Sequence, residues 1–210
     1  MNRLDRSRQR LAIGLAGLAG YVDAIGFLSA DGYFVSFMSG NTTRLGVNLA
    51  TDPARAIIPA LLIGGFTCGV AAGALAAARA GARRKPAVLA LVAILLLCGG
   101  LSGAAGFHGP LMAFLVLAMG ALNNTFQRDG EVAVGLTYMT GALVKLGQAL
   151  GGAMAGQKRT GWAAYMLLWG GLAAGAVGGA FAFAHIGPGA LWLAFGGTAL
   201  ALGFALRLER

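Results

Sequence analysis

The chain has 210 residues, of which 58% are hydrophobic and 11% charged, and its mean hydropathy is +0.74. A soluble domain of this length does not need so much apolar surface for one core, so water is excluded as its main solvent. The net charge of +9 comes from short basic clusters without interleaved aromatic residues, which argues against a nucleic-acid partner. We expect an all-α polytopic membrane protein, because the long Ala/Leu/Gly runs do not alternate as membrane β-strands do.

Six apolar runs are long enough to span a bilayer, which requires about 20 residues per helix. They cover residues 11–30, 57–78, 87–107, 110–127, 162–184 and 189–206. The first run follows a cluster of arginines and resembles a signal peptide, but it continues through Asp23 and further spans follow, so we expect an uncleaved first helix. We treat residues 1–210 as a single transmembrane domain with halves of about 11–107 and 110–206.

Two further segments, residues 33–50 and 132–152, have helical length but contain Arg44 and Lys145 near their middle. The positive-inside rule bears on whether they cross, because each crossing inverts the side of every later loop. If both cross, nine of the 16 Lys and Arg lie on the N-terminal side and five opposite. If neither makes a net crossing, 13 lie on the N-terminal side and only Arg55 opposite. We therefore predict six net-crossing helices, two polar broken or re-entrant helical segments, and cytoplasmic termini.

The two halves contain an internal repeat. Ser36–Leu49 aligns without gaps on Thr137–Leu150 at an offset of 101 residues, and the same offset places Asp23 on Asn124. With three net crossings in each half, the second copy is inverted relative to the first, as in many secondary carriers. An inverted internal repeat is expected to bring the two polar segments together near the midplane. Six corresponding glycines are assigned to close helix packing: Gly65, Gly69, Gly73, Gly171, Gly175 and Gly179.

The polar residues inside the membrane are candidates for a solute pathway. A cation at this depth is costly unless it faces protein or water, so we expect Asp23 to be the counter-ion of Arg44, leaving Lys145 to attract an anion. Gly40 and Gly141 each follow a hydroxyl residue and could let a helix break toward a ligand. The candidate substrate-binding residues are Asp23, Ser39, Gly40, Asn41, Arg44, Asn124, Thr140, Gly141, Lys145 and Gln148.

Structural roles are open for the same residues. The two cations could tie helices together or extend to the membrane interface. Gly40 and Gly141 could serve helix packing, and Asn124 could cap the end of its own helix. The sequence has no Ser/His/Asp set, phosphate loop or metal-ligand spacing, so we expect no enzyme, no cofactor and no metal site.

Three stretches of the chain, GYVDAIGFL, FVSFMSGNTTRLG and GLTYMTGALVKLGQAL, resemble the YoaK-like family of six-span bacterial membrane proteins, a domain of unknown function. The most specific parts are Asp23, the block Met38–Asn41 and the block Thr137–Gly141. Ser39 stands where the family commonly has threonine, which retains the hydroxyl. The resemblance covers nearly the whole chain and implies a bacterial inner-membrane location, but it supplies no substrate.

Together these patterns favour a small-solute transporter or channel. An anionic or zwitterionic solute is expected, because the residues inside the membrane include one carboxylate and two cations. The alternative is a non-transporting scaffold or lipid-binding assembly partner whose polar segments only lock the fold. Besides the solute, we expect membrane lipid as a partner, and six crossings are few for a carrier, which favours a homodimer.

Overall fold

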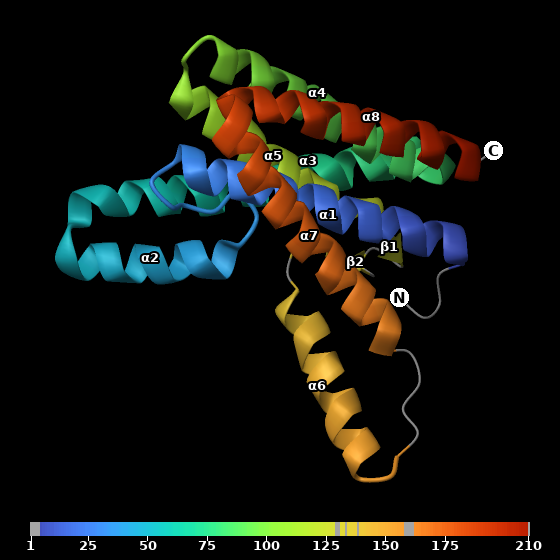
Figure 1. The fold of residues 1–210 in the computed structure, drawn as a ribbon. Helices are drawn as coiled ribbons and strands as arrows, with labels where there is room; N and C mark the ends of the chain where they lie inside the picture. Colours follow the sequence, from blue (N-terminus) through green and yellow to red (C-terminus); the bar gives the residue numbers. More distant parts are fainter. Residues whose placement is uncertain (1–4, 129–130, 133, 138, 158–161, 210) are drawn as a thin grey trace.

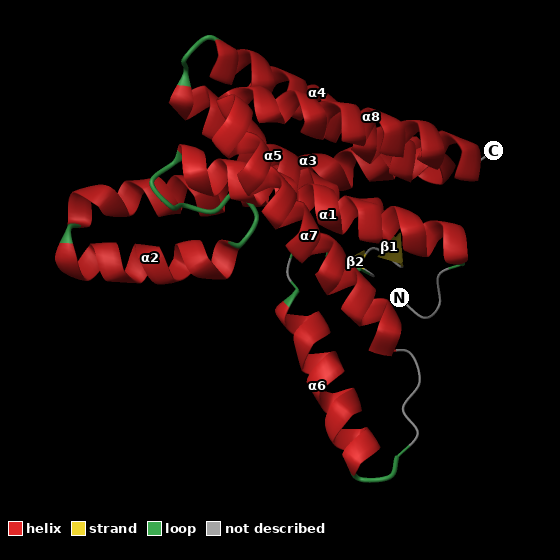
Figure 2. Cartoon of the chain, viewed as in Figure 1, coloured by secondary structure: helices red, strands yellow, loops and turns green. Residues whose placement is uncertain are grey.

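The computed structural model describes residues 5–128, 131–132, 134–137, 139–157 and 162–209. This part of the chain is mainly helical (Figure 2). Its α-helices are α1 (Arg6–Ser29), α2 (Met38–Thr51), α3 (Ile57–Ala80), α4 (Arg84–Ala104), α5 (His108–Leu122), α6 (Thr140–Met154), α7 (Trp162–Ile186) and α8 (Ala190–Leu208). Short 3-10 turns are η1 (Pro53–Ala56), η2 (Gly81–Arg83), η3 (Asn123–Thr125) and η4 (Gly187–Gly189). The strands β1 (Gln127–Arg128) and β2 (Glu131–Val132) pair antiparallel.

Three helical stretches in the described residues are long and apolar enough to cross a membrane: Arg6–Ser29, Pro53–Ala104 and Trp162–Leu208. The second contains α3 and α4, the third contains α7 and α8, and in each the chain reverses direction (Figure 1). The reversals occur at Gly81 and Gly187, whose φ values of 54° and 55° are readily adopted by glycine. By length and composition, the chain is a helical membrane protein.

Helices of one half pack mainly on helices of the other half. Near the centre of the bundle, α1 crosses α7 and α5 crosses α3, while α4 packs against α5 and α8 (Figure 1). Glycine makes these crossings close. A Cβ on Gly175 would lie 1.9 Å from the carbonyl oxygen of Gly17, and one on Gly69 would lie 2.3 Å from that of Leu117. The assignment of the corresponding glycines to helix packing is thus confirmed.

The same glycine contacts recur in both halves. A Cβ on Gly73 would lie 2.7 Å from the carbonyl oxygen of Ala121, and one on Gly179 would lie 2.3 Å from that of Tyr21. Tyr21 and Ala121 hold matching places on α1 and α5, which are therefore related by an offset of 100 residues. The offset of 101 that aligns α2 with α6 does not apply to the preceding helix.

α2 and α6 are the least covered helices. α2 begins at Met38 and α6 at Thr140, so both are shorter than the predicted segments 33–50 and 132–152. Each has one buried residue, Asn41 in α2 and Ala142 in α6. After α1 the chain turns back, and α2 starts beside the bundle and runs toward the end at which α1 finished (Figure 1). α2 packs against α3, and α6 packs against α7. α2 and α6 point in different directions and diverge from each other (Figure 1).

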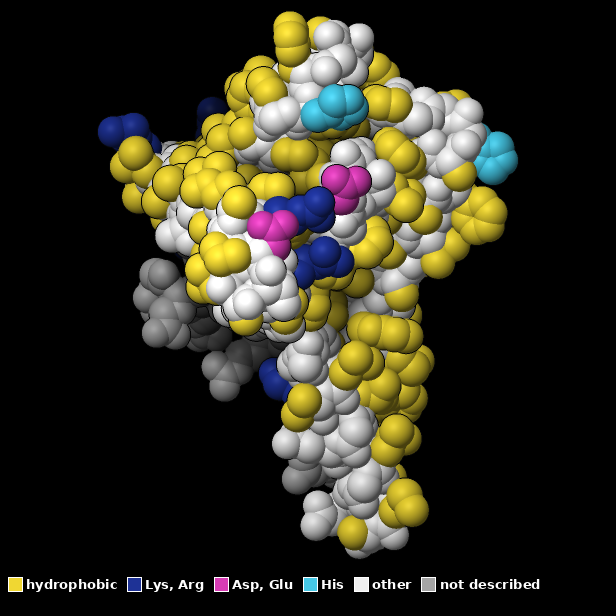
Figure 3. Space-filling view, turned by 90° about the vertical axis from the view of Figure 1, so that its left-hand side faces the viewer, with side chains coloured by type: hydrophobic (Ala, Val, Ile, Leu, Met, Phe, Trp, Pro, Cys, Tyr) yellow, Lys and Arg dark blue, Asp and Glu magenta, His cyan; other side chains and the backbone are white. Residues whose placement is uncertain are grey.

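Cationic residues are concentrated near one end of the bundle. This is the end at which α1 begins and α8 finishes (Figure 1). The helix termini there include Arg6, Arg8, Arg10, Arg79, Arg84, Lys85 and Arg207. Figure 3 views the opposite end, where a small group of basic and acidic side chains interrupts a largely hydrophobic surface. There the residue pair that follows α2, Asp52 and Arg55, forms an exposed ion pair with an Nε–Oδ2 distance of 3.2 Å.

Candidate functional site

The loop of residues 30–37, here called the re-entrant loop, returns along α1 before α2 begins. Asp23 lies seven residues before Ala30, which corresponds to roughly 10 Å along a helix. Its Oδ1 accepts hydrogen bonds from the backbone N–H groups of Val35, at 2.9 Å, and Ser36, at 2.7 Å. The carboxylate therefore satisfies loop N–H groups that have no helical partner. It also fixes how far the loop reaches back along α1.

Asn41 holds the same loop from the α2 side. Its side chain is fully buried, its Oδ1 accepts from the N–H of Phe34 at 3.1 Å, and its Nδ2 donates to the Phe34 carbonyl at 2.7 Å. The side-chain amide of Asn41 thus forms the same pair of hydrogen bonds with Phe34 that the backbone of an adjacent strand would form. A Cβ on Gly40 would lie 2.7 Å from the Phe37 ring and 2.8 Å from the Phe34 ring, so glycine is needed where the loop packs on α2. Ser39, one residue earlier, is exposed.

Arg44 contacts an aromatic ring of the re-entrant loop. Its guanidinium carbon lies 5.0 Å from the centroid of the Tyr33 ring, a cation–π geometry. The Tyr33 hydroxyl in turn accepts from Asn48 Nδ2 at 3.1 Å. The predicted Asp23–Arg44 ion pair is not found. The ion pairs among the described residues are Arg8–Asp5, Arg55–Asp52 and Lys85–Glu209, and the oxygen of Asp23 is directed to backbone N–H groups instead.

In the second half, Asn123 makes the contact that Asp23 makes in the first. Its Oδ1 accepts from the N–H of Leu136 at 3.2 Å, and its Nδ2 donates to the hydroxyl of Thr137 at 3.0 Å. Leu136 and Thr137 correspond to Val35 and Ser36 at the offset of 101 residues. A side-chain oxygen of η3, which follows α5, therefore holds the segment before α6, as a side-chain oxygen of α1 holds the segment before α2.

Asn124, which the sequence alignment placed opposite Asp23, has a different role. Its Nδ2 donates to the Val70 carbonyl of α3 at 2.9 Å and to the Ala121 carbonyl of its own helix at 3.3 Å. Its Oδ1 accepts from Gln127. Asn124 thus links the end of α5 to α3, in agreement with the helix-capping alternative. The sequence alignment was wrong by one residue here, because Leu136 follows Asn123 by 13 residues whereas Val35 follows Asp23 by 12.

The remaining candidates lie on α6. Lys145 is exposed, and its Nζ lies 3.1 Å from the hydroxyl of Tyr165 and 4.4 Å from the centroid of that ring. Thr140, Gly141 and Gln148 are exposed on the same helix, and a Cβ on Gly141 would meet no atom within 4 Å. Unlike Gly40, Gly141 is not required by packing within the chain.

The structure separates the candidate residues into two groups. Asp23, Ser39, Gly40, Asn41 and Arg44 gather around the re-entrant loop, whereas Thr140, Gly141, Lys145 and Gln148 lie on α6, which diverges from α2 (Figure 1). The two cations contact different tyrosines, so the expected meeting of Arg44 with Lys145 is not found among the contacts of either.

Sequence reasoning missed three residues of these groups: Tyr33, Asn123 and Tyr165. The two tyrosines carry no repeat signal, because neither has a tyrosine at the matching position of the other half. Asn123 could have been found by its place directly beside Asn124.

The chain matches the family model described as "Protein of unknown function (DUF1275)" over residues 11–204. It is similar to the UPF0700 transmembrane protein RA0705 of Rhizobium meliloti (strain 1021), with 40% identity over 195 residues that cover 89% of this chain and 83% of that relative. No solved structure matches the chain significantly. The resemblance to an uncharacterised family of membrane proteins is therefore confirmed. The chain belongs to the DUF1275 family of membrane proteins of unknown function.

Proposed function

We propose that this protein crosses the bacterial inner membrane six times and consists of two inverted copies of one unit. The path of the chain supports this proposal, because α2 returns toward the end at which α1 finished, so the segment 30–51 makes no net crossing (Figure 1). The recurring glycine contacts and the matching hydrogen bonds of Asp23 and Asn123 support two related copies. α1, α3 and α4 would then be the crossings of one copy, and α5, α7 and α8 those of the other.

The charge distribution supports cytoplasmic termini. Loops on the cytoplasmic side carry an excess of Lys and Arg. The end of the bundle that holds the start of α1, the end of α3, the start of α4 and the end of α8 carries most of the described cations, whereas Arg55 lies at the end shown in Figure 3. The cation-rich end is accordingly the cytoplasmic one.

The function that this architecture supports best is the passage of a small anionic or zwitterionic solute. The single observation that carries the proposal is non-helical backbone beside a candidate membrane span: residues 33–37 lie against α1 and are held by Asp23 and the buried Asn41. With α1 across the bilayer, this backbone would lie at membrane depth. Hydrocarbon cannot solvate such backbone, so it persists only where it is buried in protein or lines a water-filled cavity. Carriers and channels use broken helices of this kind to bind solutes near the midplane.

The direction of the broken helices favours an anion. α2 and α6 both begin beside the bundle and run away from it (Figure 1), so their N-termini, which carry the positive end of the helix dipole, would face a solute at that edge of the bundle. Ser39 and Thr140 lie in the first turns of these helices and are exposed. Arg44 and Lys145 lie about one turn further along, where each adds a positive charge.

The test is solute flux into proteoliposomes that contain purified protein, measured over a panel of small inorganic anions, carboxylates and amino acids. We expect uptake of at least one solute above the level of protein-free liposomes, and we expect Arg44→Ala to reduce it at least tenfold, an effect equivalent to about 1.4 kcal/mol. The matched control is Arg55→Ala, which removes an exposed arginine outside the re-entrant loop and should transport normally. Absence of flux over the whole panel from folded protein would refute the proposal.

A scaffold or lipid-binding assembly partner is the second candidate, and one observation favours it. Asp23, Asn41 and Asn124 all form hydrogen bonds with groups of the fold itself, as expected of residues that only lock the structure. The exposed polar side chains of α6, including Lys145 and Gln148, would need a cover at membrane depth. A second copy of the chain would provide one, so we propose a homodimer under either function.

A further inference from the structure

The end of the bundle that holds both termini contains a polar pocket between α1, α4 and α8. Its volume is about 410 Å³, and it is lined by Arg8, Gly81, Ala82, Arg84, Lys85, Leu208 and Glu209. Lys85 Nζ lies 2.5 Å from Glu209 Oε1, and the two side chains are only 9% and 8% exposed. This buried ion pair closes one wall of the pocket.

One atom of this pair lacks a partner. Glu209 Oε2 is buried and accepts no hydrogen bond from the described residues. Buried polar atoms are satisfied in the large majority of cases, and one left without a donor costs free energy. A carboxylate oxygen in this position favours a ligand that brings a strong donor, and an ammonium group offers three.

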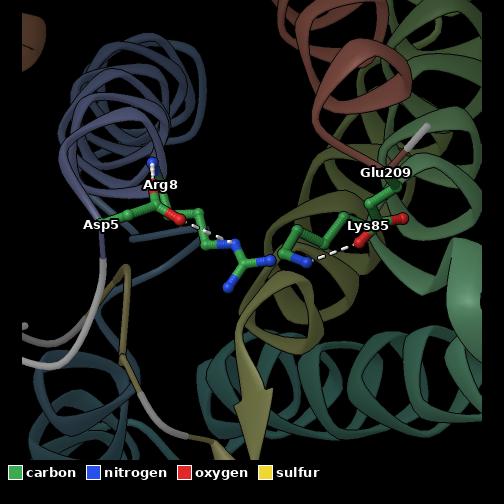
Figure 4. Close-up of polar contacts among 4 residues, drawn as sticks. All are labelled: Asp5, Arg8, Lys85 and Glu209. Carbon is green, nitrogen blue, oxygen red and sulfur yellow. Dashed lines mark hydrogen bonds and ion pairs between the residues drawn. The ribbon is translucent and has the colours of Figure 1, made fainter.

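The same pocket presents cations that favour an anion. Figure 4 shows the guanidinium of Arg8 pointing from α1 toward the ammonium of Lys85 on α4. Arg8 uses its Nε for Asp5, at 3.3 Å from Oδ2, and Arg84 lines the pocket beside Lys85. Guanidinium groups match phosphate through parallel hydrogen bonds. An anion placed here would also reduce the repulsion between the facing cations.

A single ligand would need a primary ammonium group and a phosphate a short distance apart. We propose that this pocket binds a phosphoethanolamine group, with its ammonium donating to Glu209 and its phosphate held by Arg8 and Arg84. The pocket lies where α4 begins and α8 ends, at the surface of the membrane, which favours the headgroup of phosphatidylethanolamine over a free ligand. This inference does not depend on solute transport. It requires only that α4 and α8 span the bilayer.

Binding can be measured by native mass spectrometry of the full chain in a neutral detergent, with three lipids of identical acyl chains. We expect phosphatidylethanolamine to bind about tenfold or more tightly than phosphatidylcholine, whose trimethylammonium has no N–H donor, because a hydrogen bond to a charged group is lost. Phosphatidylglycerol, which has no ammonium, should also bind more weakly. Equal binding of the three lipids would overturn the proposal.

Variants assign the selectivity to particular residues. Glu209→Gln should abolish the preference for phosphatidylethanolamine over phosphatidylcholine. The double variant Lys85→Met with Glu209→Gln leaves no unpaired buried charge, so it should fold. It should also lose the preference for phosphatidylethanolamine over phosphatidylcholine. Arg84→Ala should weaken binding of all three lipids, whereas the control Arg83→Ala, an exposed neighbour outside the pocket, should not. A preference for phosphatidylethanolamine retained in the folded double variant would overturn the assignment.

Free phosphoethanolamine distinguishes the two sources of the ligand. Competition by millimolar free phosphoethanolamine against the lipid would support recognition of the headgroup by this pocket. A soluble ligand would stabilise the protein without lipid, whereas a lipid ligand would require acyl chains for tight binding. If free phosphoethanolamine neither competes with the lipid nor stabilises the protein, and phosphatidylcholine binds as well as phosphatidylethanolamine, the pocket does not recognise this group.

Discussion

Replacement of Asp23 by alanine should release the re-entrant loop. The carboxylate accepts from two backbone N–H groups, those of Val35 and Ser36, at 2.9 and 2.7 Å. A hydrogen bond to a charged group contributes about 1.5–3 kcal/mol, so Asp23→Ala should lower the free energy of unfolding by roughly 3–6 kcal/mol. Asp23→Asn keeps an acceptor oxygen, as Asn123 does in the other half, and should lose about half as much because neutral bonds are weaker.

Equilibrium unfolding in mixed micelles measures these losses, and amide hydrogen exchange at Val35 and Ser36 locates them. The control is Asp52→Ala, which breaks an exposed ion pair with Arg55 and should cost no more than about 1 kcal/mol. Wild-type stability and wild-type amide protection in Asp23→Ala would refute the reasoning. Equal losses in Asp23→Ala and Asp23→Asn would show that the negative charge, not an acceptor oxygen, is what the loop requires.

Two further predictions follow from the packing and the exposure of single residues. Gly175→Ala would place a Cβ 1.9 Å from a backbone oxygen and should destabilise the protein by about 1–3 kcal/mol. Gly170→Ala on the same helix would place a Cβ with no atom within 4 Å and should be neutral. Equal thermal stability of the two variants would contradict the close crossing of α1 and α7. In a background without the native cysteines, Ser39→Cys and Thr140→Cys should react with a membrane-impermeant thiol reagent if water reaches the starts of α2 and α6. Leu200→Cys, at an exposed apolar position of α8 that we expect to face lipid, should not react. Inert cysteines at both test positions would favour the scaffold.

Much of the fold could be predicted from the sequence because membrane helices leave strong signals. Apolar length located the long helices, and the four-residue glycine spacing identified the crossings that Gly69 and Gly175 make possible. The prediction for residues 110–127 was too long, since α5 ends at Leu122 and a 3-10 turn follows. Residues 123–125 are Asn, Asn and Thr, but a hydropathy window of about 19 residues averages over so short a polar run.

The candidate site was predicted less well because its main contacts involve backbone atoms. The sequence indicated Asn41 as a substrate-binding residue, but its side chain is buried against the Phe34 backbone. Likewise, charge complementarity suggested that Asp23 pairs with Arg44, whereas loop N–H groups occupy the carboxylate. Side-chain patterns do not reveal which backbone groups lack hydrogen-bond partners. The need of the loop backbone for such partners decided the orientation of Asp23 and Asn41.

The crossing of α1 with α7 and of α3 with α5 has a consequence for biosynthesis. When the ribosome has completed α4, the glycine surfaces of α1 and α3 have no complementary helix, because α5 and α7 have not yet been made. The early membrane intermediate must therefore remain loosely associated, and its final packing waits for the C-terminal residues. Separately expressed fragments split between α4 and α5 should accordingly be degraded alone and be rescued when both are produced in the same cell.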